Sequence, residues 1–139
     1  MKLWLFKEEP SHYPWDQLVE DGKAVWTGVK NNWAQKNLRE ETDKGDRVLY
    51  YHTGGERAVV GIAEVVTDPY PDPNDDSGKR VVVDIEPVRK LKRPVPLAEI
   101  KQETTFEDSP LVKIGRLSVV PITAEQWAAV ERLEQEPDA

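Results

Sequence analysis

The stretch RVLYYHTGGERAVVGIAEVV, residues 47–66, decides the fold of this chain. Residues 47–52 are rich in β-forming side chains and residues 58–66 are almost entirely apolar, which predicts two long strands. The TGGE segment between them, residues 53–56, is typical of a hairpin turn. Gly61 inside the second strand indicates a bulge or a close backbone approach. We therefore expect this hairpin to form the centre of a sheet.

Further strands are predicted on both sides of the hairpin. Residues 3–6 are apolar on both faces, which is typical of a central buried strand. Residues 79–89 alternate between apolar and charged side chains and predict a half-buried antiparallel strand. A last strand is expected over residues 116–120, before Pro121. Residues 68–78 contain three prolines and predict a loop without helix or strand, and Pro94 and Pro96 predict a turn.

Short helices are expected between and after these strands. One follows Pro14, with Trp15, Leu18 and Val19 on its buried side. Others are expected from the asparagines at 31–32, with Ala34 and Leu38 as an apolar edge, and over residues 97–101. The last helix begins at a capping box formed by Thr123 and Gln126, and its predicted buried edge is Trp127, Val130 and Leu133. Together these elements predict a single α+β domain over residues 1–139, built on a small mixed or antiparallel β-barrel with short flanking helices.

Composition narrows the functional classes. The 139 residues contain no cysteine and two histidines, so a zinc site is not expected, and neither is any other metal or cofactor. No apolar run approaches the ~20 residues of a membrane helix, which favours a soluble, cytoplasmic protein without membrane contact. The net charge of −7 argues against a protein that coats polyanions non-specifically. A local basic cluster, Arg89, Lys90, Lys92 and Arg93, is either a solvated strand end, a phosphate track or a protein-binding surface.

The candidate site begins at VWTGVKNNWAQKNLR, residues 25–39. A strand ending in Trp26 is broken at Gly28, and a helix then starts, which is the arrangement of a pocket wall. An indole at such a junction can stack on a nucleobase, worth about 1–3 kcal/mol. For Trp26 a core position and a pocket position are equally compatible with the sequence, whereas Trp33 is expected to pack on the helix surface.

No enzyme motif is recognisable in the chain, and polar groups near strand ends are the remaining candidates. Glu8 and Glu9 are adjacent, so on a strand they point to opposite faces and cannot form an acid–base pair by themselves. His52 is either a general base or the partner in a capping hydrogen bond. The alternative to a binding protein is therefore an enzyme that acts on a nucleotide or a small nucleic-acid-derived ligand through Glu8 or Glu9 and His52.

Several motifs, spread over nearly the whole chain, resemble the EVE domain family. They are WLFKEEP (4–10), WTGVKN (26–31), YHT (51–53), GIAEV (61–65), YPD (70–72) and the segment from LV (111–112) through RLSV (116–119). The resemblance implies a PUA-like β-barrel, related in fold to YTH domains. It also implies a non-catalytic reader whose pocket accepts a flipped modified base, with modified cytosine in DNA as the ligand class. Trp26 is similar to a cage tryptophan of the YTH arrangement and Thr27 to the small polar residue after it, with Lys7 lining the same pocket.

One segment departs from the family pattern. The common GVRNYQARN is GVKNNWAQK here, at residues 28–36. Lys30 keeps the positive charge but lacks the planar fork of arginine, and Asn32 and Trp33 replace a Tyr-Gln pair. Ligand preference is therefore expected to differ from that of other members.

The expected partner is nucleic acid carrying a modified base, DNA rather than RNA, bound by a monomer. The expected ligand-binding residues are Lys7, Trp26, Thr27, Gly28, Val29, Asn31, His52, Thr53, Arg116 and Ser118. The expected phosphate contacts are Lys30, Arg89, Lys90, Lys92 and Arg93.

Overall fold

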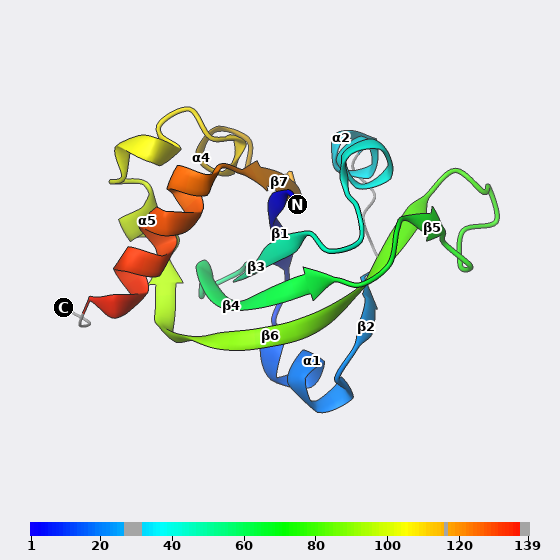
Figure 1. Ribbon diagram of the computed structural model, residues 1–139, viewed down its shortest axis with the longest axis horizontal. Coiled ribbons are helices and arrows are strands. Elements are labelled where there is room, and N and C mark those ends of the chain that lie inside the picture. The colour runs from blue at the N-terminus through cyan, green and yellow to red at the C-terminus, as the bar shows by residue number, and fades with distance from the viewer. Residues whose placement is uncertain (27–31, 116, 137–139) are drawn as a thin grey trace.

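The computed structural model describes residues 1–26, 32–115 and 117–136 (Figure 1). The strands are β1 (Leu3–Glu8), β2 (Ala24–Trp26), β3 (Arg47–His52), β4 (Ala58–Val65), β5 (Tyr70–Pro71), β6 (Val81–Pro96) and β7 (Val119–Ile122). The helices are α1 (Trp15–Asp21), α2 (Asn32–Lys36), α3 (Leu97–Ile100), α4 (Pro110–Lys113) and α5 (Ala124–Gln135), with a π-helical turn η1 (Asn37–Glu41) and a 3₁₀ turn η2 (Thr104–Phe106).

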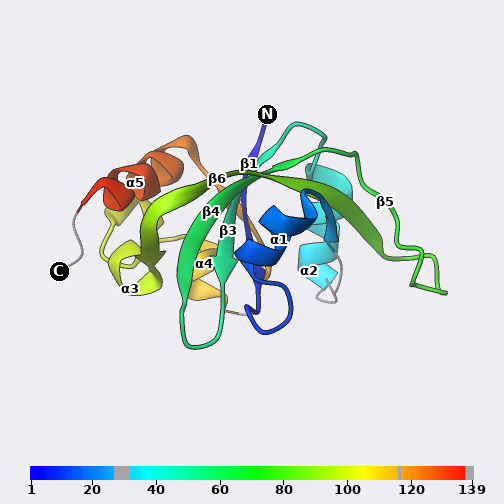
Figure 2. The same cartoon turned by 90° about the horizontal axis from the view of Figure 1, so that it is seen from below.

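The strands form one mixed sheet in the order β2-β6-β4-β3-β1-β7, and β5 pairs with β6 outside this path. Only the β1–β3 pair is parallel among the described strands. The long strand β6 pairs with both β4 and β2, and the sheet curls into a half-barrel (Figure 2). Helices α3, α4 and α5 gather on one side of β1, and α1 and α2 lie on the other (Figures 1 and 2).

The predicted central hairpin is confirmed, because β3 and β4 pair antiparallel with Leu49 opposite Ile62. The ladder shifts register after Tyr50, opposite Gly61, so the predicted bulge is present. The predicted close approach is present as well. A Cβ built on Gly61 would lie 2.7 Å from three ring carbons of Trp15, so only glycine admits the indole at this position. The expected central position of β1 is also confirmed, since Leu5 and Phe6 are fully buried.

Three expectations that rested on prolines are wrong. The predicted loop at 68–78 contains β5, whose Tyr70 pairs with Val82 of β6. The predicted turn at Pro94 and Pro96 is instead the end of β6. The pairing of β6 with β4 is interrupted over residues 91–94. Because Pro94 lies in this interruption, its missing N–H removes no ladder hydrogen bond. The last strand begins at Val119 and runs through Pro121, which an edge strand tolerates.

The predicted starts of the helices agree with the structure better than their predicted buried faces do. Thr123 and Gln126 form the predicted capping box, with reciprocal hydrogen bonds of 3.1 and 2.9 Å. Val130 and Leu133 are buried as expected, whereas Trp127 is only half-buried. In α1, Trp15 and Leu18 fill the contact with the sheet, and Val19 is 53% exposed, contrary to the prediction.

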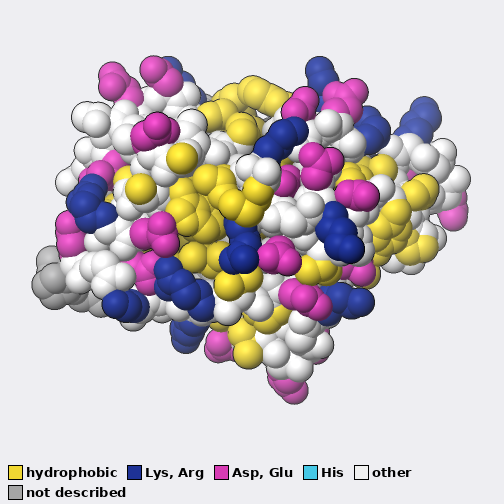
Figure 3. Space-filling view, viewed as in Figure 1, with side chains coloured by type: hydrophobic (Ala, Val, Ile, Leu, Met, Phe, Trp, Pro, Cys, Tyr) yellow, Lys and Arg dark blue, Asp and Glu magenta, His cyan; other side chains and the backbone are white. Residues whose placement is uncertain are grey.

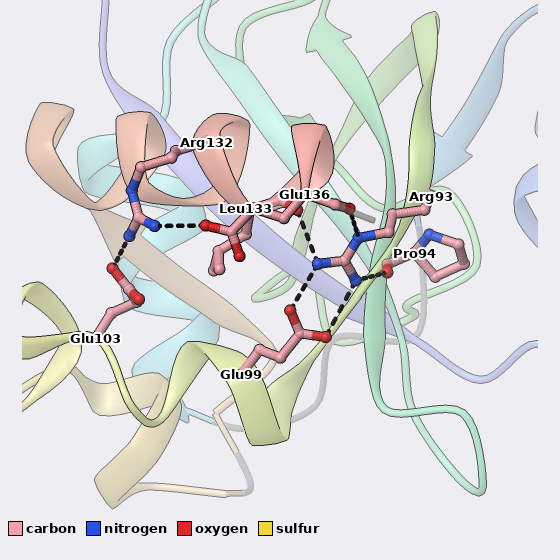
Figure 4. Close-up of polar contacts among 7 residues, drawn as sticks. All are labelled: Arg93, Pro94, Glu99, Glu103, Arg132, Leu133 and Glu136. Atoms are coloured by element: carbon pink, nitrogen blue, oxygen red, sulfur yellow. Dashed lines mark hydrogen bonds and ion pairs between the residues drawn. The ribbon is translucent and has the colours of Figure 1, made fainter. Parts of the chain in front are cut away.

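Helix α5 is fixed to the sheet by arginines of β6. The guanidinium of Arg93 donates to the backbone oxygens of Leu133 and Glu136, at 2.8 and 2.7 Å, and to both carboxylate oxygens of Glu99 in α3 (Figure 4). Arg132 of α5 contacts Glu103 in the same region (Figure 4). The bonds from Arg93 therefore add side-chain donors to the carbonyls at the end of α5, where the oxygen of Leu133 also accepts from the N–H of Glu136.

Candidate nucleic-acid interface

Trp26 lies at the end of β2, where its ring stacks on Phe6 of β1 with centroids 4.2 Å apart and planes at 18°. The side chain is 3% exposed, so the structure gives it a core position. Its indole Nε1 is nevertheless buried without a hydrogen-bond partner among the described residues, as is that of Trp15. A buried N–H without an acceptor costs about 1–3 kcal/mol. Trp26 therefore combines a packed ring with a donor that has no acceptor in the described part of the chain.

Lys7 points to the other face of β1. Its Nζ donates to the backbone oxygen of Gly115 at 3.0 Å and lies 5.9 Å from the centre of the Tyr51 ring. Burial of the ammonium group lowers the pKa of Lys7. Phe6, the preceding residue, carries the Trp26 stack, and neighbouring side chains of a strand point to opposite faces. Lys7 and the Trp26 stack therefore lie on opposite faces of β1, and their expected common pocket stays a prediction.

His52 is engaged at both ring nitrogens. Its Nε2 accepts a hydrogen bond from the backbone N–H of Trp15 at 3.0 Å, and its Nδ1 lies 2.6 Å from a carboxylate oxygen of Glu56. The side chain is buried and holds the start of α1 against β3. Of the two interpretations of His52, the structure supports the capping hydrogen bond. Glu8 is occupied separately, by His12 and by the backbone N–H of Glu9.

Three of the expected ligand-binding residues converge where β1 ends. The backbone N–H of Thr53 donates to Glu8 O at 2.9 Å, and the oxygen of Ser118 accepts from the N–H of Lys7 at 3.0 Å. Lys7 and Thr53 line a cavity of about 310 Å³ between the β3–β4 hairpin and helices α3 and α4. Thr27, Gly28, Val29, Lys30, Asn31 and Arg116, which were also expected at the site, lie outside the described residues.

The same cavity holds two cations that the sequence prediction missed, Arg57 and Lys101. Its inner surface includes Tyr51, which is 3% exposed. Burial raises the pKa of Tyr51, and the positive charge of Arg57 opposes that rise. Arg57 comes directly after the hairpin turn at residues 53–56, so its position in the sequence could have suggested it as a site residue. No motif in the sequence marks Lys101.

The basic cluster of β6 is used inside the protein. Arg89 donates from both terminal nitrogens to the two carboxylate oxygens of Glu134, each at 2.8 Å, and Lys92 Nζ donates to Gln135 at 2.6 Å. Arg93 holds the end of α5 as described above. These three residues therefore bind α5, because β6 runs beneath that helix, and the expectation that they contact phosphate stays a prediction. Lys90 is exposed.

A cavity of about 930 Å³ lies between the start of β1, β7 and α2. Trp4, Pro121 and Ile122 line it together with Trp33, which is 47% exposed. Figure 3 shows apolar side chains gathered near the middle of the face that Figure 1 views. Trp33 thus lies at the helix surface, as predicted.

The described parts of the chain show neither a metal-binding group of side chains nor a helix able to span a membrane. Within residues 1–26, 32–115 and 117–136, no three His, Asp or Glu side chains come together in a group able to hold a metal ion. None of the helices described there is long and apolar enough to cross a membrane.

A curled mixed sheet, with helices on both of its sides and an aromatic stack joining β1 to β2, defines an α+β domain of the PUA-like class. The chain belongs to the EVE domain family, which matches residues 2–133. The predicted fold class and family are both confirmed. A YTH domain of Zygosaccharomyces rouxii, solved with N6-methyladenosine RNA, shares the fold at a TM-score of 0.60 and 15% identity, covering 99% of this chain and 89% of that one.

Similar proteins come from bacteria and vertebrates. Rpa0253 from Rhodopseudomonas palustris, solved by NMR, is 43% identical to this chain with a TM-score of 0.90. The match covers 100% of this chain and 97% of that one. Thymocyte nuclear protein 1 from Gallus gallus is 32% identical, over 96% of this chain and 69% of that protein. The human THYN1 protein, crystallised in complex with DNA containing 5-methylcytosine, is 26% identical with a TM-score of 0.90, over 99% of this chain and 100% of that one.

Proposed function

We propose that this protein is a non-catalytic reader that binds nucleic acid as a monomer and holds a modified base, with modified cytosine in DNA as the preferred ligand. The observation that carries the proposal is the whole-chain likeness to human THYN1, whose structure contains DNA with 5-methylcytosine. The indole N–H of Trp26 supports it, because no described residue accepts a hydrogen bond from it and a base edge offers an acceptor.

Trp26 is suited to hold a flat ligand because its orientation is fixed. Phe6 covers one face of the indole at a centroid distance of 4.2 Å, so the plane of the ring is set by two strands. A base stacked on the opposite face would gain about 1–3 kcal/mol. Because the side chain is 3% exposed, a base reaches the indole only when the atoms that cover it move aside.

An enzymatic alternative receives less support. A general base needs a ring nitrogen that is free to take a proton from the substrate. Both nitrogens of His52 have partners, Trp15 N–H and Glu56, and Glu8 is bound to His12. The proposed acid–base pair would have to break structural hydrogen bonds before it could act.

Oligonucleotide titrations by fluorescence anisotropy test the proposal. We expect DNA with 5-methylcytosine to bind at least ~10-fold tighter than plain DNA, which corresponds to about 1.4 kcal/mol. The conservative variant Trp26→Phe keeps an aromatic ring but removes the N–H, and should lower this discrimination. Trp127→Phe, at the half-buried tryptophan of α5, is the matched control and should leave it unchanged. Equal affinity of the wild-type protein for modified and plain DNA and RNA would refute the proposal.

A further inference from the structure

The cavity between the β3–β4 hairpin and helices α3 and α4 differs from the rest of the surface in its charge. Three cations line it, Lys7, Arg57 and Lys101, and no Asp or Glu is among its lining residues. The wall is otherwise apolar or small, with Leu97, Leu111, Val112 and Gly115. Such a recess concentrates positive potential in a protein whose net charge is −7.

These three cations lack carboxylate partners in the described part of the chain. Elsewhere the described cations are commonly paired, as Arg47 is with Glu64 at 3.1 Å and Lys113 with Asp108 at 2.8 Å. Burying or crowding positive charges without counter-charge costs free energy. Their grouping around one recess therefore indicates an anion that completes the site.

Arg57 is held in a conformation that is unfavourable for its residue type. Its φ of +44° is the only positive value at a non-glycine residue among those described. The backbone oxygen of Arg57 accepts from the N–H of Leu97 at 2.8 Å, and its Nε donates to Gly54 O at 3.3 Å, so the conformation is fixed from both sides. The two terminal guanidinium nitrogens make no hydrogen bond to described residues and remain available as a fork. Strain of this kind is concentrated at binding sites.

Lys7 is held in a similar way. One proton of its ammonium group is donated to Gly115 O, and the Tyr51 ring lies beside it. Lysine carries three donors, so two remain for a ligand. Lys101 follows the end of α3 and is exposed, which makes it the outer cation of the group.

We propose that Lys7, Arg57 and Lys101 form a phosphate-binding site that holds one backbone phosphodiester of the bound nucleic-acid strand. A phosphate offers several acceptor oxygens at once, which suits a guanidinium fork and an ammonium group converging from different sides. The inference rests on the proposed function for its source of phosphate. Lys7 follows Phe6 directly in β1, so the site lies one residue from the Trp26 stack but on the opposite face of the strand.

The test uses the full chain and measures affinity against salt concentration. Arg57→Gly removes the side chain and relieves the positive φ, so this variant should fold and melt no lower than the wild type. Lys101→Gln removes the outer cation. Lys44→Gln is the matched control, because Lys44 is exposed and lies just before β3, at the other end of the sheet.

Each phosphate contact that is lost should reduce the slope of log K against log salt by about 0.7–0.9. We expect Arg57→Gly and Lys101→Gln to show this reduction and to weaken plain and methylated oligonucleotides by the same factor. Lys44→Gln should keep the wild-type slope. Unchanged slopes for both site variants would overturn the assignment.

Two further measurements separate the possible failures. Inorganic phosphate, titrated in an NMR experiment, should shift the amide signals of Thr53 and Gly54 in the wild type but not in Arg57→Gly. Shifts with free phosphate, combined with unchanged oligonucleotide slopes, would show a site for small anions and overturn its assignment to the strand. If the wild type fails to distinguish modified from plain bases while the slopes still fall, the phosphate site stands and the proposed base recognition fails.

Discussion

Replacing Arg89 by methionine should destabilise the protein strongly, although Arg89 is a surface residue. Its guanidinium binds both carboxylate oxygens of Glu134 at 2.8 Å, and a third bond to that carboxylate comes from the backbone N–H of Lys92 at 3.0 Å. The Glu134 side chain is fully buried, whereas that of Arg89 is 40% exposed. Arg89→Met therefore leaves a buried carboxylate with one of its three hydrogen bonds.

The expected loss follows from the burial of Glu134. Removing one partner of a buried ion pair costs about 3–5 kcal/mol, because the other charge remains uncompensated. Water can reach the place of the half-exposed guanidinium, so we expect a loss of ~2–4 kcal/mol. That is a large fraction of the ~5–15 kcal/mol that stabilises a typical domain. Urea unfolding followed by tryptophan fluorescence at neutral pH measures it.

A double variant tests whether the buried charge is the cause. Arg89→Met with Glu134→Leu removes both charges, and it should recover much of the stability lost by Arg89→Met alone. If Arg89→Met loses less than ~1 kcal/mol, or if the double variant is as unstable as the single one, the reasoning is refuted.

The same pair gives a pH dependence with a defined sign. The hydrogen bonds from Arg89, opposed by burial, hold the pKa of Glu134 below its ordinary value of 4.5. A carboxyl group with a lowered pKa in the folded state stabilises the protein fully above its unfolded pKa. This contribution is lost as the pH falls from 4.5 through the lower folded pKa. The stability difference between wild type and Glu134→Gln should therefore shrink in that acid range and stay constant above it.

Two further predictions concern single residues of the sheet, one of them a close contact and the other a hydrogen bond. Gly61→Ala should lower the thermal midpoint, because its Cβ would lie 2.7 Å from the Trp15 ring; overpacking of this kind costs about 1–3 kcal/mol, and an unchanged midpoint would contradict the close approach. The hydrogen bond from Tyr70 to Asp84, 2.6 Å long, is the main cause that raises the pKa of Tyr70 to about 12. Asp84→Asn should bring this pKa back toward 10 in an ultraviolet titration, with Tyr70→Phe identifying the transition; a wild-type value near 10 would show that the bond does not form.

Local patterns predicted the elements whose signals lie within a few residues. The hairpin at 47–66 and the capping box at Thr123 and Gln126 were both predictable, because turn chemistry and capping act over short distances. The extent of β6 was not. Considered alone, Pro94 predicts the end of a strand. Its actual position, in an interruption of the ladder, depends on how β6 pairs with β4, whose residues lie about thirty positions earlier in the chain.

The candidate site was predictable in part for the same reason. Lys7 and Thr53 were expected to meet because each ends a strand, and the parallel β1–β3 pair brings them to one cavity. Lys101 joins them only through the packing of α3 against β6, and nothing near it in sequence marks it. The basic residues at 89–93 were the more obvious phosphate contacts by composition, but whether a cation is free depends on α5, forty residues later.

Side chains alternate along β1, so Lys7 and the Trp26 stack lie on opposite faces of the strand, although the family resemblance implies that they line one pocket. Phe6 fixes the plane of Trp26 on one face of the strand, and Lys7 reaches the Tyr51 cavity on the other. The strand is held between β3 and β7 and its Phe6 is fully buried, so neither side chain can exchange faces without breaking the sheet. A ligand that contacts both must therefore pass over the end of β1. In the proposed complex, a nucleic-acid strand would do so with its base on one side and its phosphate on the other.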